Sequence, residues 1–194
     1  PDSGDNYPCS ECGEACAHEG GYKTGKCEVC GKPCPHDIAD QSPVDHKNYC
    51  NACGKQMFAR IQTGQHDYAH YTNLKDALAA AESGQTVTLL DDVDNNGEYA
   101  ILTGDNKTVT LDLNSHTITG GWMQVGIDRN WDNYTSSTLE VINNGSIKTS
   151  GNLSVGYSAA LDLSGWTGGE IAKVSLQKNG KVTPNPESLL IVGE

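Results

Sequence analysis

The part of the chain after residue 85 consists of short runs in which apolar and polar residues alternate. Such runs are typical of strands with one buried face. Turn signals separate them, among them Asn96-Gly97, Asn144-Gly145 and Asn179-Gly180. The strands predicted on this basis cover residues 86–90, 99–103, 108–113, 117–119, 138–142, 159–163 and 171–176. This part of the chain is therefore expected to be mainly β.

One helix is predicted just before the first of these strands. Asn73 or Thr72 can cap its N-terminus, Asp76 falls near the first turn, and Gly84 is the expected stop. Its apolar face would be formed by Leu74, Ala77, Leu78 and Ala81. A helix of about ten residues is marginal on its own in water, so we expect it to dock against an apolar surface.

The spacing of leucines in the strand-like runs indicates how the strands are arranged. Leu89 and Leu111 lie 22 residues apart, as do Leu139 and Leu161, whereas Leu111 and Leu139 lie 28 apart. The additional residues fit an outward loop over residues 120–134. A repeat of this length favours a helix-capped parallel β-solenoid, in which equivalent inward positions stack. The alternative is an antiparallel β-sandwich, whose strands recur at about 8 to 12 residues.

The first sixty residues are organised differently, because all 8 cysteines of the chain lie between Cys9 and Cys53. Residues 9–18 have the pattern Cys-x-x-Cys-Gly-x-x-Cys-x-His, and residues 27–36 repeat it. A third copy begins at Cys50 and is incomplete. Met57 and Ala59 stand where its third Cys and its His would be.

This cysteine pattern predicts zinc binding. A Cys-x-x-Cys-Gly turn brings two sulfur atoms together, and thiolate plus imidazole ligands in a tetrahedral site suit Zn²⁺. Large apolar side chains are too few in residues 1–60 to form a core, so metal is expected to stabilise the fold, by about 10–16 kcal/mol in small zinc peptides. The alternative is four disulfides, which eight cysteines could form in about 105 ways.

Two arrangements of the zinc ligands fit the repeats. In the staggered arrangement each zinc takes the Cys-x-His of one repeat and the Cys-x-x-Cys of the next, and the incomplete third repeat is then explained. Its two sites are Cys16, His18, Cys27, Cys30 and Cys34, His36, Cys50, Cys53, with Cys9 and Cys12 as additional ligand candidates. The alternative is one zinc within each complete repeat. Either arrangement fills all four positions, as in structural sites. The isolated histidines His46, His66 and His70 are expected on the surface.

Charge and hydropathy narrow the classes of partner. The chain carries 25 Asp and Glu against 13 Lys and Arg, a formal charge of −12, and has no basic stripe for nucleic acid. It has no apolar run of about 20 residues to span a membrane, and residues 1–7 lack the pattern of a signal peptide. The predicted organisation is a zinc-binding region over 1–60, a polar linker over 61–71 and a β domain over 72–194.

The acidic residues do not form a recognisable catalytic set. Asp91, Asp92 and Asp94 imitate the start of a calcium loop, but Thr103 takes the twelfth position, where a bidentate Glu is needed. Bound Ca²⁺ is therefore not expected. Asp112 alternates with leucines and is assigned to a solvent face, and His116 to a bend where it caps the turn. We expect no enzymatic activity.

Aromatic residues provide the candidate contact surface. The residues concerned are Trp122, Arg129, Trp131 and Tyr134 in the expected loop, with Trp166 further along the chain. Exposed aromatic rings can contact sugars or serve as hot spots for proteins. Covering apolar surface is the alternative role for these side chains. A host glycan or a host protein such as mucin or immunoglobulin is the kind of partner considered.

Several of these segments resemble known proteins. Tyr71-Thr-Asn-Leu74-Lys-Asp-Ala77-Leu78 through residues 84–90 resembles the helical cap and first strand of right-handed β-helix proteins related to pectate lyases. Residues 109–118 and 139–147 are similar to coils in large surface proteins of Gram-positive, often gut, bacteria, where Cys-x-x-Cys-Gly-x-x-Cys-x-His units also occur. The resemblance covers residues 9–56 and 71–150.

The resemblance implies a right-handed parallel β-helix that follows zinc-ribbon-like repeats, in a secreted or cell-wall-attached protein. A binding or adhesion module is the function it favours. Two alternatives stay open: the N-terminal fragment of a β-helix polysaccharide lyase or glycoside hydrolase, and a structural spacer between domains.

Overall fold

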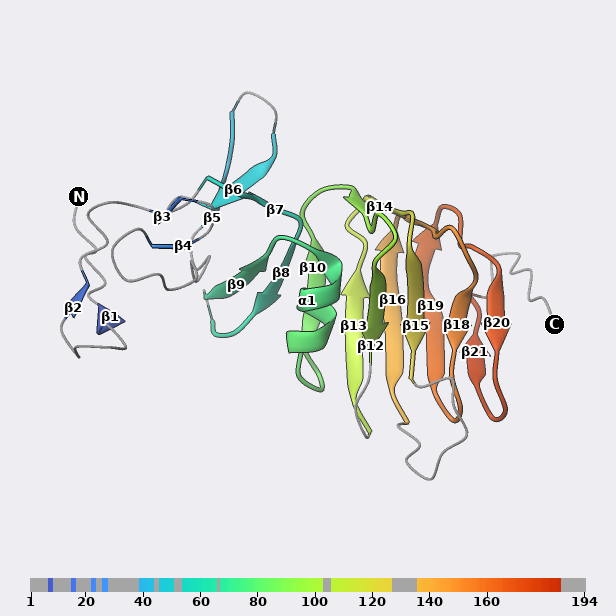
Figure 1. Cartoon of the computed structure of the whole chain (residues 1–194). Coiled ribbons are helices and arrows are strands. Elements are labelled where there is room, and N and C mark those ends of the chain that lie inside the picture. The colour runs from blue at the N-terminus through green and yellow to red at the C-terminus, as the bar shows by residue number, and fades with distance from the viewer. Residues whose placement is uncertain are drawn as a thin grey trace.

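The computed structural model describes residues 39–43, 46–50, 54–65, 67–102, 106–126 and 136–185, and the backbone of four short strands before them. Within these ranges the chain forms strands and one helix, α1 (Leu74–Ala80). In Figure 1 the chain advances from left to right as it passes from β10 to β21, and α1 lies beside β10. The prediction of a mainly β protein is therefore confirmed.

From β10 onward the chain runs repeatedly through three parallel sheets in the same order. We call each round through the sheets a passage, and almost every passage adds one strand to each sheet. The first contains β10 (Thr86–Leu89), β13 (Thr108–Asp112), β16 (Thr138–Asn144), β19 (Ala160–Gly168) and β21 (Lys181–Thr183). The second contains β11 (Val93–Asp94), β14 (Thr117–Thr119) and β17 (Ser146–Lys148), and the third contains β12 (Tyr99–Leu102), β15 (Trp122–Val125), β18 (Leu153–Val155) and β20 (Val174–Leu176). Neighbours within these sets pair in parallel. In the fourth passage a bridge from Ile147 to Ile171 takes the place of a strand in the second sheet.

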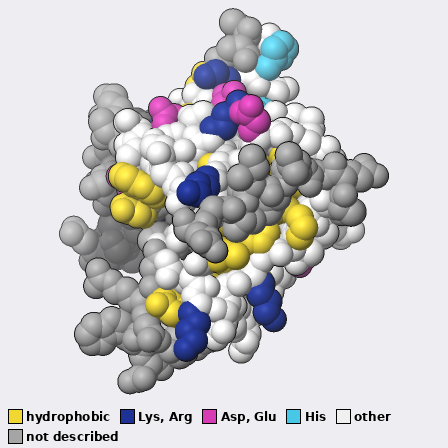
Figure 2. All heavy atoms as spheres, turned by 90° about the vertical axis from the view of Figure 1, so that its right-hand side faces the viewer, with side chains coloured by type: hydrophobic (Ala, Val, Ile, Leu, Met, Phe, Trp, Pro, Cys, Tyr) yellow, Lys and Arg dark blue, Asp and Glu magenta, His cyan; other side chains and the backbone are white. Residues whose placement is uncertain are grey.

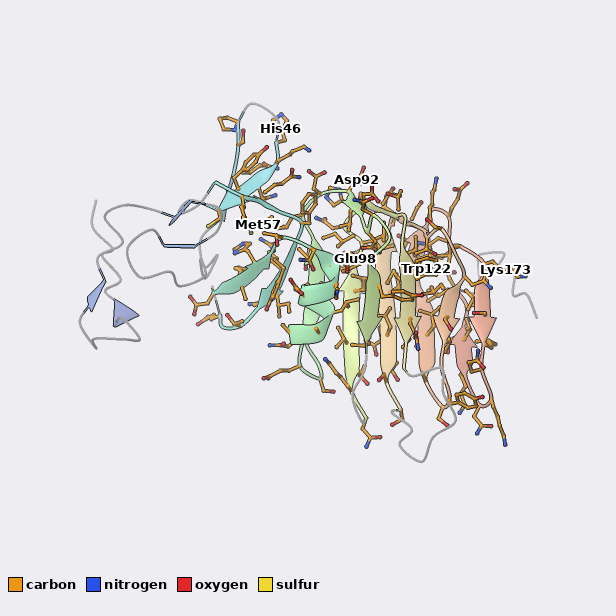
Figure 3. The ribbon with its side chains drawn as sticks, viewed as in Figure 1. His46, Met57, Asp92, Glu98, Trp122 and Lys173 are labelled. Carbon is orange, nitrogen blue, oxygen red and sulfur yellow. The ribbon has the colours of Figure 1, made fainter. Side chains whose placement is uncertain are left out.

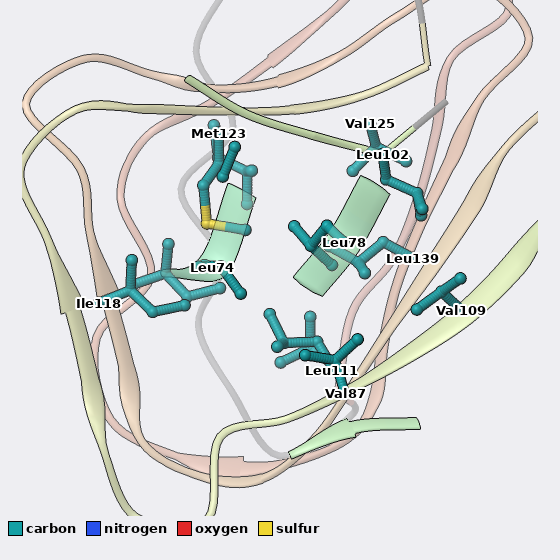
Figure 4. Close-up of a cluster of buried hydrophobic side chains, with 14 of the residues drawn as sticks. Leu74, Leu78, Val87, Leu102, Val109, Leu111, Ile118, Met123, Val125 and Leu139 are labelled. Carbon is teal, nitrogen blue, oxygen red and sulfur yellow. The ribbon is translucent and has the colours of Figure 1, made fainter. Parts of the chain in front are cut away.

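Apolar side chains fill the space between the three sheets (Figure 4). Alternate residues of the strands are buried, such as Val109 and Leu111 in β13, as the period of a pleated strand requires. The buried set includes Leu102, Ile118, Met123, Val125, Leu139 and Ile147. Burial of this apolar surface, at about 25 cal/mol per Å², is the main favourable term for this part of the fold.

Helix α1 covers the N-terminal end of this core, as predicted. The Asn73 side chain caps it by accepting a hydrogen bond from the Asp76 backbone N–H at 2.8 Å. Its apolar face is buried through Leu74, Ala77 and Leu78. The helix ends before the expected stop at Gly84, which has a φ of +85° in the turn that leads to β10.

The opposite end of the sheets is less completely covered by the described residues. Leu176 in β20 is 41% exposed. Figure 2 views this end and shows hydrophobic side chains at the surface with Lys or Arg side chains near them.

The predicted stacking of leucines is wrong for two of the three spacings. Leu111 pairs with Val87 and not with Leu89, and Leu139 pairs with Val109 and not with Leu111. Only the pair of Leu139 with Leu161 has the predicted register. A shift by two residues keeps each side chain on the same face, so alternation cannot detect it, and the turns between strands decide the register.

The predicted connector before the helix is also wrong. Strands β8 (Ala59–Gln62) and β9 (Tyr68–Tyr71) pair antiparallel with each other, and β8 pairs antiparallel with β10. Ala59 and Ile61 are buried in the core, which holds this hairpin against the first sheet. The hairpin therefore extends the first sheet at its N-terminal edge.

The histidines that the sequence places on the surface differ in their environment. His46 is exposed, as expected, but His70 in β9 is only 9% exposed, so its assignment is wrong. Its strand partner Arg60 lies with its guanidinium carbon 4.4 Å from the centre of the Tyr68 ring. His66 lies outside the described residues.

A glycine substitution tests the tight packing of neighbouring turns. Gly145 has a φ of +143°, and a Cβ added there would lie 2.4 Å from the carbonyl oxygen of His116. We expect Gly145→Ala to lower the free energy of unfolding by more than about 2 kcal/mol relative to Gly168→Ala. Gly168 is the matched control, because its φ is +153° and no atom lies within 4 Å of a Cβ added there. Urea unfolding followed by circular dichroism measures the difference, and equal losses would contradict the predicted clash.

Candidate functional site

The predicted zinc ligands are only partly covered by the structure. Cys50 is described in full, and for Cys16 and Cys27 the backbone is described, in β2 (Ala15–Cys16) and β4 (Lys26–Cys27). The others lie outside the described residues: Cys9, Cys12, His18, Cys30, Cys34, His36 and Cys53. Within the described ranges, no three His, Cys, Asp or Glu side chains are placed to hold a metal ion. The zinc sites therefore stay predictions.

Backbone hydrogen bonds connect Cys50 with Gly54 and Lys55. Cys50 ends strand β6 (Asn48–Cys50) and is 2% exposed. The Gly54 N–H donates to the Cys50 carbonyl oxygen, and the Cys50 N–H donates to the Lys55 carbonyl oxygen, both at 2.8 Å. Gly54 has a φ of +68°, a left-handed conformation that favours glycine. This geometry explains the glycine of the Cys-x-x-Cys-Gly pattern.

The repeat seen in the sequence is also a repeat of strand pairing. In the first copy, β1 (Tyr7–Pro8) and β2 pair Tyr7 with Cys16. In the third copy, β6 and β7 (Gln56–Met57) pair Asn48 with Met57. Both pairs enclose the same number of residues, so the two hairpins share one register around their Cys-x-x-Cys segments.

A further hairpin lies between each Cys-x-His and the Cys-x-x-Cys that follows it. The first is formed by β3 (Tyr22–Lys23) and β4, which pair Tyr22 with Cys27. The second is formed by β5 (Ala39–Gln41) and β6, which pair Ala39 with Cys50. Because a hairpin brings its two ends together, the chain enters and leaves each of these hairpins at the same end.

The incomplete end of the third repeat has a structural explanation. Met57 and Ala59, which stand in the positions of Cys and His, are both 0% exposed. Ala59 belongs to the core cluster and pairs with Leu89 in β10. These two positions therefore carry core side chains where the cysteine repeats pass into the first sheet.

Polar contacts join the third repeat to the first passage of the sheets. The Gln56 side-chain amide donates to Asp91 Oδ2 at 2.7 Å, and Lys47 Nζ lies 3.5 Å from the same oxygen. Asn48 Nδ2 donates to the Leu90 carbonyl oxygen at 3.4 Å. The Asp91 carboxylate therefore contacts two side chains of the cysteine-rich region, one through a hydrogen bond and one through an ion pair.

The other candidate carboxylates hold turns. Asp92 Oδ1 accepts from the Thr117 N–H at 2.8 Å and lies 3.5 Å from His116 Nδ1. Asp94 Oδ1 accepts from the Asn96 N–H at 2.9 Å. Asp112 Oδ1 accepts from the Asn114 N–H at 2.9 Å and from the Asn143 side-chain amide at 2.8 Å. Each of these carboxylates has a structural partner. Thr103, the twelfth position of the calcium-like segment, lies outside the described residues.

Trp122 lies on the outer face of the third sheet, at the start of β15. It is therefore in a strand and not in the loop that was predicted over residues 120–134. Its indole stacks on the Tyr99 ring with centroids 4.9 Å apart and planes 18° apart. Trp122 is 41% exposed and Tyr99 is 49% exposed. The indole also covers Gly151, where an added Cβ would lie 2.3 Å from Nε1.

The same outward row continues along the third sheet. The pairing of Met123 with Leu153 and of Leu153 with Val174 brings the preceding residues Trp122, Asn152 and Lys173 into one row. Together with Tyr99 we call these residues the outer strip (Figure 3 labels Trp122 and Lys173). Sequence reasoning missed Tyr99, because only the strand register places it next to Trp122.

Trp166 does not belong to this surface, and its prediction as an exposed contact residue is wrong. It is 5% exposed, and its indole N–H donates to the Gly145 carbonyl oxygen at 3.0 Å. The pairing of β19 with β16 shifts after Asp162, so that Ser164 and Gly165 are both exposed and Trp166 points inward. Arg129, Trp131 and Tyr134 lie outside the described residues.

Comparison with protein-family models, with curated proteins and with solved structures finds no match to this chain. In the part of the chain that the structure describes, no helix is long and apolar enough to cross a membrane.

Proposed function

We propose that this chain is a non-catalytic binding or adhesion module of a secreted or cell-wall-attached bacterial protein, with a host protein or glycan as its partner. The observation that carries the proposal is the exposed stack of Tyr99 and Trp122 on a regular sheet. Aromatic side chains that are already ordered by stacking on a sheet lose little further conformational entropy when a partner binds. This favours their use as contact residues.

We assign the sheets to a helix-capped right-handed parallel β-helix. The parallel pairing of successive strands from β10 to β21 supports this assignment, as does the fixed order in which each passage visits the sheets. Inward side chains of adjacent passages pair with one another, for example Leu139 with Leu161. In such a scaffold each outward row of side chains has a regular spacing of about 4.8 Å between strands.

We assign structural Zn²⁺ to the cysteine repeats, about two ions per chain. The hydrogen bond from the Gly54 N–H to the Cys50 carbonyl oxygen and the thiolate and imidazole character of the donors support this metal. When bound, zinc supplies a cross-link that offsets the ordering entropy of a region poor in apolar side chains. Core burial of Met57 and Ala59 supports the staggered ligand sets, because the third repeat then needs only its Cys-x-x-Cys.

The environment of the acidic residues favours binding over catalysis. Asp91 is held by Gln56 and Lys47, and the carboxylates of Asp94 and Asp112 accept hydrogen bonds from backbone N–H groups two residues further on. Such contacts hold turns in place. A general acid and base pair would instead need environments that set two pKa values apart around one bound substrate.

Substitution of Trp122 tests the proposed contact surface. We expect Trp122→Ala to weaken binding to a glycan array or to mucosal secretions at least tenfold, as truncation of an aromatic hot spot does. Leu176→Ala is the matched control, because Leu176 is also 41% exposed but lies in the last strand of the third sheet. Unchanged binding by Trp122→Ala with retained strand content would remove the outer strip as the site. Turnover of a polysaccharide would overturn the non-catalytic proposal.

A further inference from the structure

A hollow of about 500 Å³ lies where the link between β7 and β8, the N-terminal turn of α1 and the turn after β11 meet. Its volume falls in the range of about 300–1,000 Å³ that is usual for small-molecule sites. Glu98 lines the hollow, and the next residue, Tyr99, begins the outer strip. The hollow therefore adjoins the proposed contact surface.

One wall of the hollow contains a hydrogen-bond donor without a partner. Asn95 lines the hollow, is 7% exposed, and its Nδ2 is buried with no hydrogen-bond partner within the described part of the chain. Its backbone is fixed, because its N–H donates to Thr119 O at 2.9 Å and its carbonyl accepts from the Glu98 N–H at 2.7 Å. A buried polar group of this kind destabilises the folded chain until an acceptor reaches it.

Glycine at the neighbouring passage keeps Asn95 in this position. A Cβ added at Gly121 would lie 2.6 Å from the Asn95 Cβ and 2.4 Å from the Glu98 carbonyl oxygen. The turn that carries Asn95 is therefore packed directly against the next one. The backbone of Asn95 is thereby held in place at the wall of the hollow.

Half of the other polar side chains that line the hollow are carboxylates. Asp76, Asp92, Asp94 and Glu98 line it together with a single lysine, Lys75, which gives a formal charge of −3. Lys75 Nζ donates to Glu98 Oε2 at 2.8 Å, and this bond raises the pKa of the lysine, so Lys75 stays protonated. Each carboxylate has more acceptor positions than the partners described above occupy.

We propose that this hollow binds an uncharged sugar residue of a glycan, an inference that rests on the proposed binding function. Sugar hydroxyls donate to the carboxylates, and a sugar oxygen accepts from the Asn95 amide. The half-buried Phe58 ring, which also lines the hollow, offers an apolar face to the C–H groups of the sugar ring. A metal cation would satisfy the carboxylates but offers no acceptor to Asn95, and an acidic sugar is repelled by the net charge.

Calorimetric titration of the full chain tests the ligand class. The probes are neutral oligosaccharides and uronic-acid oligosaccharides of matched length, with calcium chloride as a third titrant. We expect binding of a neutral probe and at least tenfold weaker binding of its acidic counterpart, with the difference reduced at high salt. Equal binding of the acidic probe, or displacement of the neutral probe by calcium, would overturn the inference.

Substitution of Asn95 tests the site itself. Asn95→Leu removes the donor at similar volume, and we expect at least tenfold weaker sugar binding with an unfolding midpoint that is unchanged or higher. Asp94→Asn is expected to weaken binding about tenfold. Asp162→Asn is its control, because Asp162 Oδ1 accepts from the Ser164 N–H at 2.8 Å in a similar turn that does not line the hollow. Undiminished sugar binding by Asn95→Leu would overturn the inference.

The two proposals fail in different ways. Sugar binding that is lost in Trp122→Ala and kept in Asn95→Leu would overturn the hollow and leave the binding function in place. Binding of a host protein by the outer strip, without binding of any sugar, would also overturn the hollow as a sugar site and leave the binding function in place. Absence of both sugar and protein binding would overturn the binding function together with the hollow.

Discussion

Metal analysis of the purified chain should find about two zinc ions per molecule. The expectation rests on two sets of four Cys and His ligands, each sufficient for a closed tetrahedral site. In the second set, the Cys50 backbone is held by hydrogen bonds with Gly54 and Lys55, and Gly54 has a left-handed conformation. A metal-free chain with four disulfides would contradict this prediction.

Single substitutions decide how the ligands are shared. In the staggered arrangement Cys50→Ser should lose about one zinc equivalent and Cys9→Ser none, so the second variant is the control for the first. Tyr7 of β1 and Asn48 of β6 pair in the same register, and in the sequence Cys9 and Cys50 each follow these residues by two positions. Loss of zinc in Cys9→Ser, with full zinc content in Cys50→Ser, would establish one zinc within each repeat.

Removal of zinc should unfold the cysteine repeats and leave the parallel sheets folded. The core cluster begins at Ala59, and α1 with the β8–β9 hairpin covers its N-terminal end. The contacts to Asp91 from Lys47 and Gln56 are polar and partly exposed, so their loss is expected to cost the sheets only about 1 kcal/mol. By comparison, structural zinc is worth about 10–16 kcal/mol in small zinc peptides.

Hydrogen exchange before and after chelation measures this difference by segment. Amides of β13 and β16 should keep their protection, and amides of β5 to β7 should lose it. Loss of protection in both regions in a single transition would show that the repeats and the sheets share one cooperative unit.

The sequence predicts the elements of this fold better than their register. Residues 117–119 form a strand as predicted, and the Asn73 cap begins the helix at Leu74. Alternation of apolar residues locates strands because burial on one face requires it, but a shift by two residues leaves that alternation unchanged. The sequence therefore could not show that Leu111 pairs with Val87.

Candidate site residues were predictable only where local chemistry marks them. The spacing of Cys and His makes the cysteine repeats recognisable in the sequence. The structure adds the reason why the third repeat has Met57 and Ala59 in place of Cys and His: both side chains are buried. The direction of Trp166 depends on a register shift in β19, which no local signal marks. Asn95 was not predicted either, since its unpartnered amide becomes visible only when the neighbouring turn is packed against it.

The most direct test of the binding proposal follows the tryptophan indole N–H signals of the ¹⁵N-labelled full chain by NMR while oligosaccharides from host and plant polysaccharides are added. The Trp122 signal should shift, because its ring is exposed in the outer strip. The Trp166 signal should stay in place, because this ring is 5% exposed and its N–H is bonded to Gly145. Binding that leaves the Trp122 signal unmoved, or the appearance of cleaved sugar in the same spectra, would contradict the account.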